Sequence, residues 1–264
     1  MRRNKKRNRP DCVTEDEVEK YTKIYIQARL KHNNYTIRSN RFFDKLIKTT
    51  KQYHLLLGDT GTGKSAFLLN GYFYFLLKIL KKGYTIYYFT LRNSNTLEKV
   101  STVKNKKNAI ILLDAFDESI QSAKDAQAML RQIEEITSEF AKVVITSRIH
   151  FFDTESEEPS VASTLKAIDL QETKYQKYYI QPFTDIDVGL YLFKKYLFRF
   201  VKHFKAHRIV NKSSDIMSRP LILSFIDLLL DKSIEYKYAY RIYETIVFGL
   251  IERESLFIKK CRRP

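Results

Sequence analysis

Eight consecutive residues, Gly58-Asp59-Thr60-Gly61-Thr62-Gly63-Lys64-Ser65, match the pattern G-x-x-x-x-G-K-[ST] in full. In this pattern backbone N–H groups curl around a phosphate, and glycine permits the tightest points of the turn. Three of the chain's seven glycines fall within these eight residues, which argues against a chance match. We predict that Lys64 reaches the outer phosphates and that Ser65 holds Mg²⁺. Ala66 follows in the first turn of a helix whose dipole would face the anion.

A second polar group follows an apolar run and reads Asp114-Ala115-Phe116-Asp117-Glu118. A carboxylate at the carboxyl end of a buried strand points into the crevice where phosphates lie. We therefore predict that Asp114 faces the Mg²⁺. Glu118 is the candidate base that orients the attacking water, with Asp117 as the alternative. The same acids could instead cap the next helix.

A third polar group, Thr146-Ser147-Arg148, also follows an apolar run. Arginine keeps its charge, so Arg148 could contact a γ-phosphate and report its presence. The structural alternative is a surface ion pair with the acidic loop from Asp153 to Glu158.

Five apolar runs alternate with helical patterns and would position these groups. The runs are Tyr53–Leu57, Thr85–Leu91, Ala109–Leu113, Lys142–Thr146 and Tyr178–Pro182. Continuous apolar or β-branched runs are typical of strands buried on both faces of a parallel sheet. The helical patterns between them include Lys64–Lys82 and Ala123–Phe140. We predict an α/β fold with a five-stranded parallel sheet between helices.

After Phe183 only helical patterns remain, at Asp185–His207, Pro220–Leu230 and Tyr238–Arg253. A small all-helical lid is therefore expected after the sheet. We divide the chain into a basic, polar amino-terminal extension (1–34), an α/β core (35–183), a helical lid (184–235) and the start of a further region (236–264).

Composition limits the classes of partner. Cys12 and Cys261 lie near opposite ends without metal-site spacing, which favours a reducing cytoplasm. No uncharged apolar run approaches the length of a membrane span. The net charge of +17 invites a nucleic-acid or anionic-membrane partner, although part of it lies in the amino-terminal tail. An ATPase that acts on nucleic acid through a basic surface therefore stays an alternative.

Taken together, these motifs resemble those of the NACHT family, a branch of the STAND class of signal-transducing P-loop ATPases and a relative of the AAA+ group. Gly58–Ser65 resembles its Walker A motif, and Asp114–Glu118 resembles its D-G-x-D-E motif. Thr146-Ser147-Arg148 is similar to its T-S-R sensor, with Ile149 where proline is usual. Met217–Leu223 is similar to the G-x-P element of the lid, with Ser218 in place of the glycine.

The resemblance implies a P-loop NTPase core of the AAA+-like type that binds ATP or ADP with Mg²⁺. It also implies slow hydrolysis, packing of Pro220 on adenine, and a winged-helix region that begins near residue 236. Such modules are switches that self-associate when ATP replaces ADP and bring effectors together, in antiphage defence in bacteria and in innate immunity in animals. The effector and sensor regions expected of the family have no counterpart in this chain, so they would belong to other segments or subunits.

Overall fold

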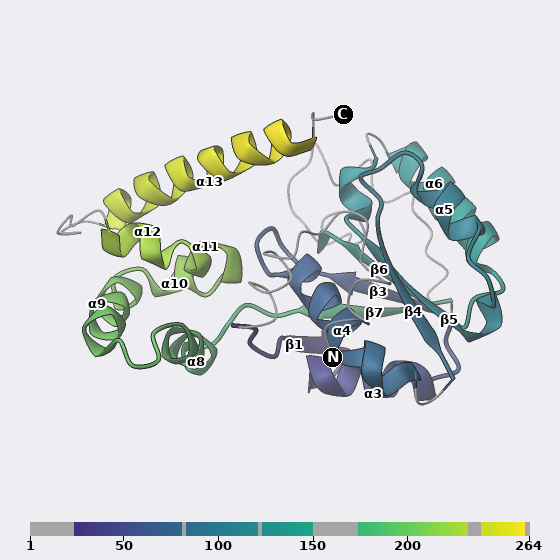
Figure 1. Ribbon diagram of the computed structural model, residues 1–264, viewed down its shortest axis with the longest axis horizontal. Coiled ribbons are helices and arrows are strands. Elements are labelled where there is room, and N and C mark those ends of the chain that lie inside the picture. Colours follow the sequence, from purple (N-terminus) through teal and green to yellow (C-terminus); the bar gives the residue numbers. More distant parts are fainter. Residues whose placement is uncertain (1–23, 81–82, 121–122, 150–173, 232–238, 262–264) are drawn as a thin grey trace. The chain divides into compact units, whose positions relative to one another are not determined.

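The computed structural model describes residues 24–80, 83–120, 123–149, 174–231 and 239–261 (Figure 1). The chain divides into two compact units. The first unit comprises residues 1–60 and 64–181, and the second comprises residues 182–264 together with Gly61–Gly63.

A seven-stranded sheet forms the centre of the first unit, in the order β2-β1-β7-β3-β6-β5-β4. The five strands from β7 to β4 are parallel, whereas β1 pairs antiparallel with both β7 and β2. The strands are β1 Arg29–His32, β2 Tyr35–Arg38, β3 Tyr53–Leu57, β4 Thr85–Thr90, β5 Ala109–Asp114, β6 Lys142–Ser147 and β7 Tyr175–Ile180.

The five parallel strands are the five apolar runs predicted from the sequence, so the α/β class is confirmed. The bounds of β3 agree with the prediction, and those of β4, β5 and β6 differ by one residue at the carboxyl end. β7 begins three residues before the predicted run, because Tyr175 already pairs with Tyr53 of β3. The prediction of a five-stranded sheet is corrected to seven strands.

The two additional strands form a hairpin that the sequence interpretation missed. β1 and β2 are joined by Asn33 and Asn34, and Asn33 adopts a left-handed backbone with φ of 48°. Asparagine tolerates this conformation, which makes it a common turn residue. Leu30 of β1 is fully buried and pairs with Ile180. The predicted domain boundary after residue 34 therefore falls inside a hairpin that belongs to the sheet.

Helices cover both faces of the sheet in the first unit (Figure 1). The elements are α3 Ser39–Lys48, α4 Lys64–Leu80, α5 Thr96–Ser101, α6 Ala123–Thr137 and the short 3-10 turns η1 Lys106–Asn108 and η2 Phe116–Glu118. Successive strand residues point to opposite faces. Accordingly, Leu56 of β3 packs with α3 and α4, whereas its neighbours Leu55 and Leu57 pack with α5 and α6.

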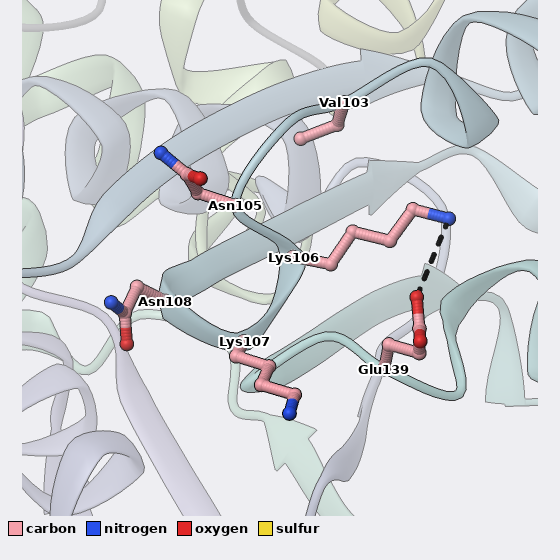
Figure 2. A pocket seen from close by; sticks show the side chains of 6 residues that line it. All are labelled: Val103, Asn105, Lys106, Lys107, Asn108 and Glu139. Carbon is pink, nitrogen blue, oxygen red and sulfur yellow. Dashed lines mark ion pairs between the residues drawn. The ribbon is translucent and has the colours of Figure 1, made fainter.

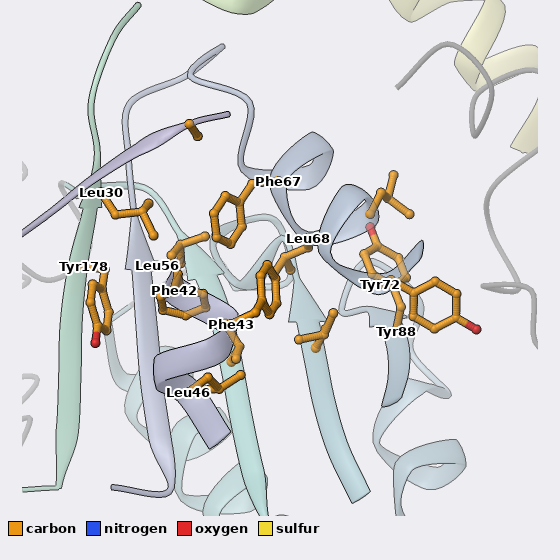
Figure 3. Close-up of a cluster of buried hydrophobic side chains, with 14 of the residues drawn as sticks. Leu30, Phe42, Phe43, Leu46, Leu56, Phe67, Leu68, Tyr72, Tyr88 and Tyr178 are labelled. Atoms are coloured by element: carbon orange, nitrogen blue, oxygen red, sulfur yellow. The ribbon is translucent and has the colours of Figure 1, made fainter. Parts of the chain in front are cut away.

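Figure 3 shows the core on the α3 and α4 side of the sheet, where several aromatic rings pack among aliphatic side chains. Phe42 and Phe43 of α3 meet Phe67 of α4, and the rings of Phe43 and Phe67 stack with centroids 5.3 Å apart. This core holds α4, and therefore the residues that precede it, against the strands.

The second unit is helical in its described part. It contains α8 Asp185–Lys195, α9 Phe200–Asn211, α10 Ser214–Met217, α11 Pro220–Ser224, α12 Ile226–Asp231 and α13 Ala239–Cys261. The single helix predicted over 185–207 is in fact two helices, and the pattern over 220–230 is also divided. The break between α8 and α9 contains Phe198 in a left-handed conformation, with φ of 68°, and has neither glycine nor proline to indicate a break.

Within the described residues, none of the helices combines the length and the apolar character needed to cross a lipid bilayer.

Candidate nucleotide-binding site

The phosphate-binding loop, Gly58–Ser65, lies between β3 and α4 as the motif requires. Gly61 and Gly63 have φ of 81° and 90°, a region that side chains with a Cβ rarely adopt. The Gly58 N–H donates a hydrogen bond of 3.3 Å to the carbonyl of Ser147 at the end of β6. The loop is thus anchored to the neighbouring strand, and its glycines provide the turn that a phosphate cradle needs.

Lys64 begins α4, and Ser65 and Ala66 follow in the same turn. The ammonium of Lys64 donates hydrogen bonds to the carbonyls of Gly58 and Asp59, at 2.7 and 2.9 Å. Burial lowers the pKa of Lys64, while the nearby charges of Asp117 and Asp114 act in the opposite direction. The lysine therefore lies folded against its own loop, and the negative charges of Asp114 and Asp117 act on it.

Asp114 ends β5 and is almost completely buried. Thr146 of β6 donates a hydrogen bond of 2.5 Å to Asp114 Oδ1, and the Tyr88 hydroxyl of β4 donates one of 2.8 Å to Oδ2. The Thr146 hydroxyl also accepts a hydrogen bond from the Ala115 N–H at 3.0 Å. Two neighbouring strands therefore fix the orientation of the predicted metal-binding carboxylate.

The backbone conformation at position 115 explains why a small residue follows Asp114 in this motif. Ala115 has φ of 63° and ψ of 47°, in the left-handed region, where a Cβ costs about 1–2 kcal/mol. Glycine or alanine is tolerated there better than a branched residue. This turn starts η2 and brings Asp117, rather than Glu118, to the buried side.

Asp117 and Arg148 form an ion pair of 2.7 Å between Oδ2 and Nε. Burial raises the pKa of Asp117, and the charges of Lys64 and Arg148 oppose that rise. The predicted sensor arginine thus lies beside a predicted base. The alternative partner proposed for Arg148, the loop from 153 to 158, lies outside the described residues.

Glu118 is placed differently. It forms an ion pair with Arg92, whose Nη2 donates a hydrogen bond of 2.8 Å to Oε1, and both side chains are partly exposed. Its charge is not among those that shift the pKa of Lys64. The structure therefore brings Lys64, Asp114, Asp117 and Arg148 together and places Glu118 at the margin.

Sequence reasoning missed the roles of Tyr88, Arg92 and Thr146. Arg92 follows the predicted strand β4 in the same way as the other polar groups follow β3, β5 and β6. The signal was therefore present, but we did not consider the residue after this strand. Tyr88 lies inside an apolar run, and Thr146 belongs to the polar group that we singled out for Arg148. Only the structure reveals the hydrogen bonds of both residues to Asp114.

The donor set fits a magnesium nucleotide. The described residues contain no group of three or more His, Cys, Asp or Glu side chains suited to a metal ion. Mg²⁺ needs no such group, because it keeps water and takes one or two protein ligands beside phosphate oxygens. Among the described residues, the buried Asp117 Oδ1 and Ser147 Oγ also lack a hydrogen-bond partner. Buried polar atoms are usually satisfied, so these two could accept a ligand or its water.

Pro220 is the first residue of α11 in the second unit, where proline is favoured because its missing N–H would have no helical partner. Its packing on adenine stays a prediction.

A separate depression of about 430 Å³ is lined by the six residues labelled in Figure 2, among them Lys106, Lys107 and Glu139. Residues 105–108 immediately precede β5, so the depression lies at the amino end of that strand, whereas Asp114 ends it. None of the predicted site residues lines it. The residues predicted to bind the nucleotide lie instead at or after the carboxyl ends of β3, β5 and β6, where open α/β sheets usually bind their ligands.

The fold and this arrangement define a P-loop NTPase module of the STAND class, which confirms the class predicted from the sequence. Residues 38–180 match the model of the family described as Novel STAND NTPase 3 (nSTAND3), and the chain belongs to that family. No curated protein matches the chain.

Several solved structures follow a similar chain path. Orc1 of Aeropyrum pernix, in complex with DNA, is 17% identical with a TM-score of 0.48, over 82% of this chain and 65% of its own. Domain III of the replication initiation protein DnaA of Thermotoga maritima is 14% identical with a TM-score of 0.45, over 78% and 90%. The RuvB Holliday junction branch migration motor of T. maritima is 9% identical with a TM-score of 0.44, over 80% and 68%. The chain thus spans about two thirds of the Orc1 chain.

Proposed function

We propose that this chain binds ATP or ADP with Mg²⁺, hydrolyses ATP slowly and acts as a nucleotide-controlled switch of the NACHT type. The observation that carries the proposal is the placement of four charged side chains around the phosphate-binding loop: Lys64 begins α4, Asp114 ends β5, and Asp117 pairs with Arg148 at 2.7 Å. The pKa of Lys64 responds to the charges of Asp117, Arg148 and Asp114. Such a cluster at strand ends, beside a glycine-rich turn, suits a triphosphate and its metal ion.

Each residue has a separate role in the proposal. The N–H groups of Gly58–Ser65 bind phosphate oxygens, and Lys64 exchanges its two carbonyl partners for them. Ser65 and Asp114 would hold the Mg²⁺, which would neutralise charge on the phosphates. Arg148 contacts the γ-phosphate from the end of β6.

The environments of the two candidate bases favour Asp117 over Glu118. A general base works best when its pKa approaches the working pH, and burial shifts the pKa of Asp117 in that direction. Its Oδ1 is also buried and has no hydrogen-bond partner among the described residues. Both acids pair with an arginine, Asp117 with Arg148 and Glu118 with Arg92, but only Asp117 is buried. We therefore assign the water-orienting role to Asp117 and keep Glu118 as the second candidate.

Calorimetry and single-turnover hydrolysis test the proposal. Lys64→Ala should abolish measurable binding of Mg-ATP, whereas Lys107→Ala, at the amino end of β5, should bind like the unmodified chain. Unchanged binding by Lys64→Ala would falsify the assignment of the phosphate loop. Asp117→Asn should keep binding and slow hydrolysis by roughly 10²–10⁴-fold, the usual contribution of a general base. An equal loss in Glu118→Gln alone would transfer the role to Glu118.

The switch itself implies a change of assembly with the nucleotide. Self-association with ATP but not ADP, measured by size-exclusion chromatography with light scattering, is the expected outcome. The effector, the sensor and a role in antiphage defence or innate immunity follow from the NACHT resemblance alone. Identical elution with ATP and ADP would contradict the proposed switch but not the proposed nucleotide binding.

The charge of the chain supports a second candidate, an AAA+-like ATPase that acts on nucleic acid. Such an enzyme should bind polynucleotide with a steep negative dependence on salt, and the polynucleotide should stimulate its hydrolysis. Hydrolysis that DNA and RNA leave unchanged would favour the switch.

A further inference from the structure

Helix α8 carries a stripe of exposed apolar side chains opposite its buried face. Val188 and Leu192 of α8 pack into the core of the second unit. On the other side, four exposed residues recur at the spacing of one helical face. They are Ile186, Leu190, Phe193 and Leu197, the last lying just after the helix.

Helix α9 has the same two-sided character. Its core face contributes Ala206, Ile209 and Val210 to the helical core. Its outer face presents Phe200, Val201 and Phe204, which are 75%, 70% and 73% exposed. A helix that is apolar on two faces normally has a partner on each of them. Because α8 and α9 pack together in the second unit (Figure 1), their exposed residues belong to one local region.

The turn between the helices adds a strained aromatic residue. Phe198 has φ of 68° and is 83% exposed. For a bulky residue this conformation costs about 1–2 kcal/mol, and so exposed a ring recovers little of that cost by packing. Strained positions of this kind concentrate at functional surfaces.

In the second half of this region, from residue 193 to residue 208, the Lys and Arg side chains have no acidic neighbours in the sequence. Residues 193–208, which we call the α8–α9 elbow, contain six Lys and Arg residues and no Asp or Glu. One of the six, Lys195, pairs with Asp227 of α12. The other five are exposed: Lys194, Arg199, Lys202, Lys205 and Arg208. The acidic residues of α8, Asp185 and Asp187, lie in its first turn, before the elbow.

We propose that the α8–α9 elbow docks on an anionic lipid bilayer. Exposed Phe, Leu and Val side chains would enter the boundary between headgroups and acyl chains, and the surrounding cations would contact acidic headgroups. This is peripheral binding, with no segment crossing the bilayer. It does not depend on the proposed nucleotide chemistry, since the elbow contains none of the predicted site residues.

Charge and side-chain type disfavour other occupants. A second copy of the elbow would bring two clusters of like charge together. Single-stranded nucleic acid could stack on the exposed Phe rings, but it would leave the aliphatic side chains of Leu197 and Val201 without an apolar environment. A bilayer uses aliphatic and aromatic side chains alike and supplies the opposite charge.

Flotation of the full chain with lipid vesicles tests the proposal. Vesicles of phosphatidylcholine with about 30 mol% phosphatidylserine should carry the protein upward, vesicles of phosphatidylcholine alone should not, and high salt should release it. Phe198→Ser with Phe204→Ser should weaken binding by at least about tenfold, as expected for two lost apolar anchors. Arg199→Glu with Lys205→Glu should weaken it by about 30-fold or more, since each lost basic residue contributes about 1 kcal/mol.

A matched control lies on α13, where Tyr243 and Phe248 are also exposed but the ion pair between Arg241 and Glu244 mixes the charges. Tyr243→Ser with Phe248→Ser should bind acidic vesicles like the unmodified chain. Circular dichroism should show that all variants fold, because the replaced side chains are exposed. Equal binding to neutral vesicles, an equal loss in the α13 control, or no flotation of the folded chain would each overturn the proposal. The proposal would also be overturned if Phe198→Ser with Phe204→Ser left vesicle binding unchanged but abolished binding of single-stranded nucleic acid or self-association.

Discussion

Arg148 and Asp117 join the end of β6 to the turn after β5 through an ion pair of 2.7 Å. The carboxylate is 3% exposed and the guanidinium is 45% exposed, so the pair couples a buried charge to one that solvent can reach. Burial alone would favour the protonated acid, and the cations Lys64 and Arg148 oppose this. In the proposed site, a γ-phosphate that draws Arg148 away would therefore also change the charge balance at the proposed base.

Replacement of Arg148 by Ala should destabilise the fold by about 1–2 kcal/mol near neutral pH, because it leaves a buried carboxylate with one cation fewer. This estimate is below the usual cost of breaking a buried pair, since solvent already screens Arg148. The loss should shrink as the pH falls through the raised pKa of Asp117 in the folded chain, because the protonated acid no longer gains from the cation. Urea unfolding at several pH values measures it.

Arg92→Ala is the matched control, because Arg92 also pairs with an acid of η2 but both partners are partly exposed. Its cost should stay below about 1 kcal/mol. Equal costs for the two variants would contradict the distinction between the buried and the exposed pair.

The candidate site was largely predictable because its chemistry follows from sequence order. The carboxyl ends of parallel strands meet at one edge, so the residues after β3, β5 and β6 had to gather there once the runs were recognised as strands. The choice between Asp117 and Glu118 was not predictable in this way. It depends on the left-handed conformation of Ala115, which sets the direction of the following turn.

The fold was less predictable where local signals were weak or absent. The strands β1 and β2 are short, and β2 is mostly exposed, so the sequence contains no apolar run that would predict them. The break after α8 has no glycine or proline; the chain turns at Phe198 against the intrinsic preference of that residue. In both places tertiary pairing or packing decided the conformation, and a sequence pattern contains only part of that information.

Thr146→Val should destabilise the chain by about 1–3 kcal/mol, because it removes two buried hydrogen bonds and leaves Asp114 Oδ1 and the Ala115 N–H without that partner. It should also weaken the Mg²⁺ dependence of nucleotide binding, since the orientation of Asp114 is loosened. Thr146→Ser keeps the hydroxyl and is the control. Chemical unfolding and calorimetry with and without Mg²⁺ would check both effects. Equal stability of the Val and Ser variants would mean that the hydroxyl does not hold Asp114.

His54 should make stability depend on pH in the acid range. It lies fully buried in β3 near the rings of Phe42 and Tyr178, and burial lowers its pKa from 6.5 to about 4. The unfolded chain therefore takes up the proton first, and stability falls as the pH drops from about 6.5 toward 4, by about 2 kcal/mol between pH 7 and pH 5. In His54→Leu this part of the decline should disappear from urea unfolding curves. A slope as steep as before would assign it to other groups.

Gly71 of α4 lies directly against the ring of Phe43 in α3, and a Cβ there would come within 1.9 Å of Cζ. Alanine normally stabilises a helix relative to glycine by about 1 kcal/mol. At Gly71 we expect the opposite, a loss of about 1–3 kcal/mol, because the overpacked helices must separate. Gly189→Ala in α8 is the matched control; nothing lies within 4 Å of its Cβ position, so it should be neutral or stabilising. Phe43→Leu should reduce the loss of stability caused by Gly71→Ala. If the losses of the two single variants simply add in the double variant, contact with Phe43 is not the reason that Gly71→Ala destabilises the chain.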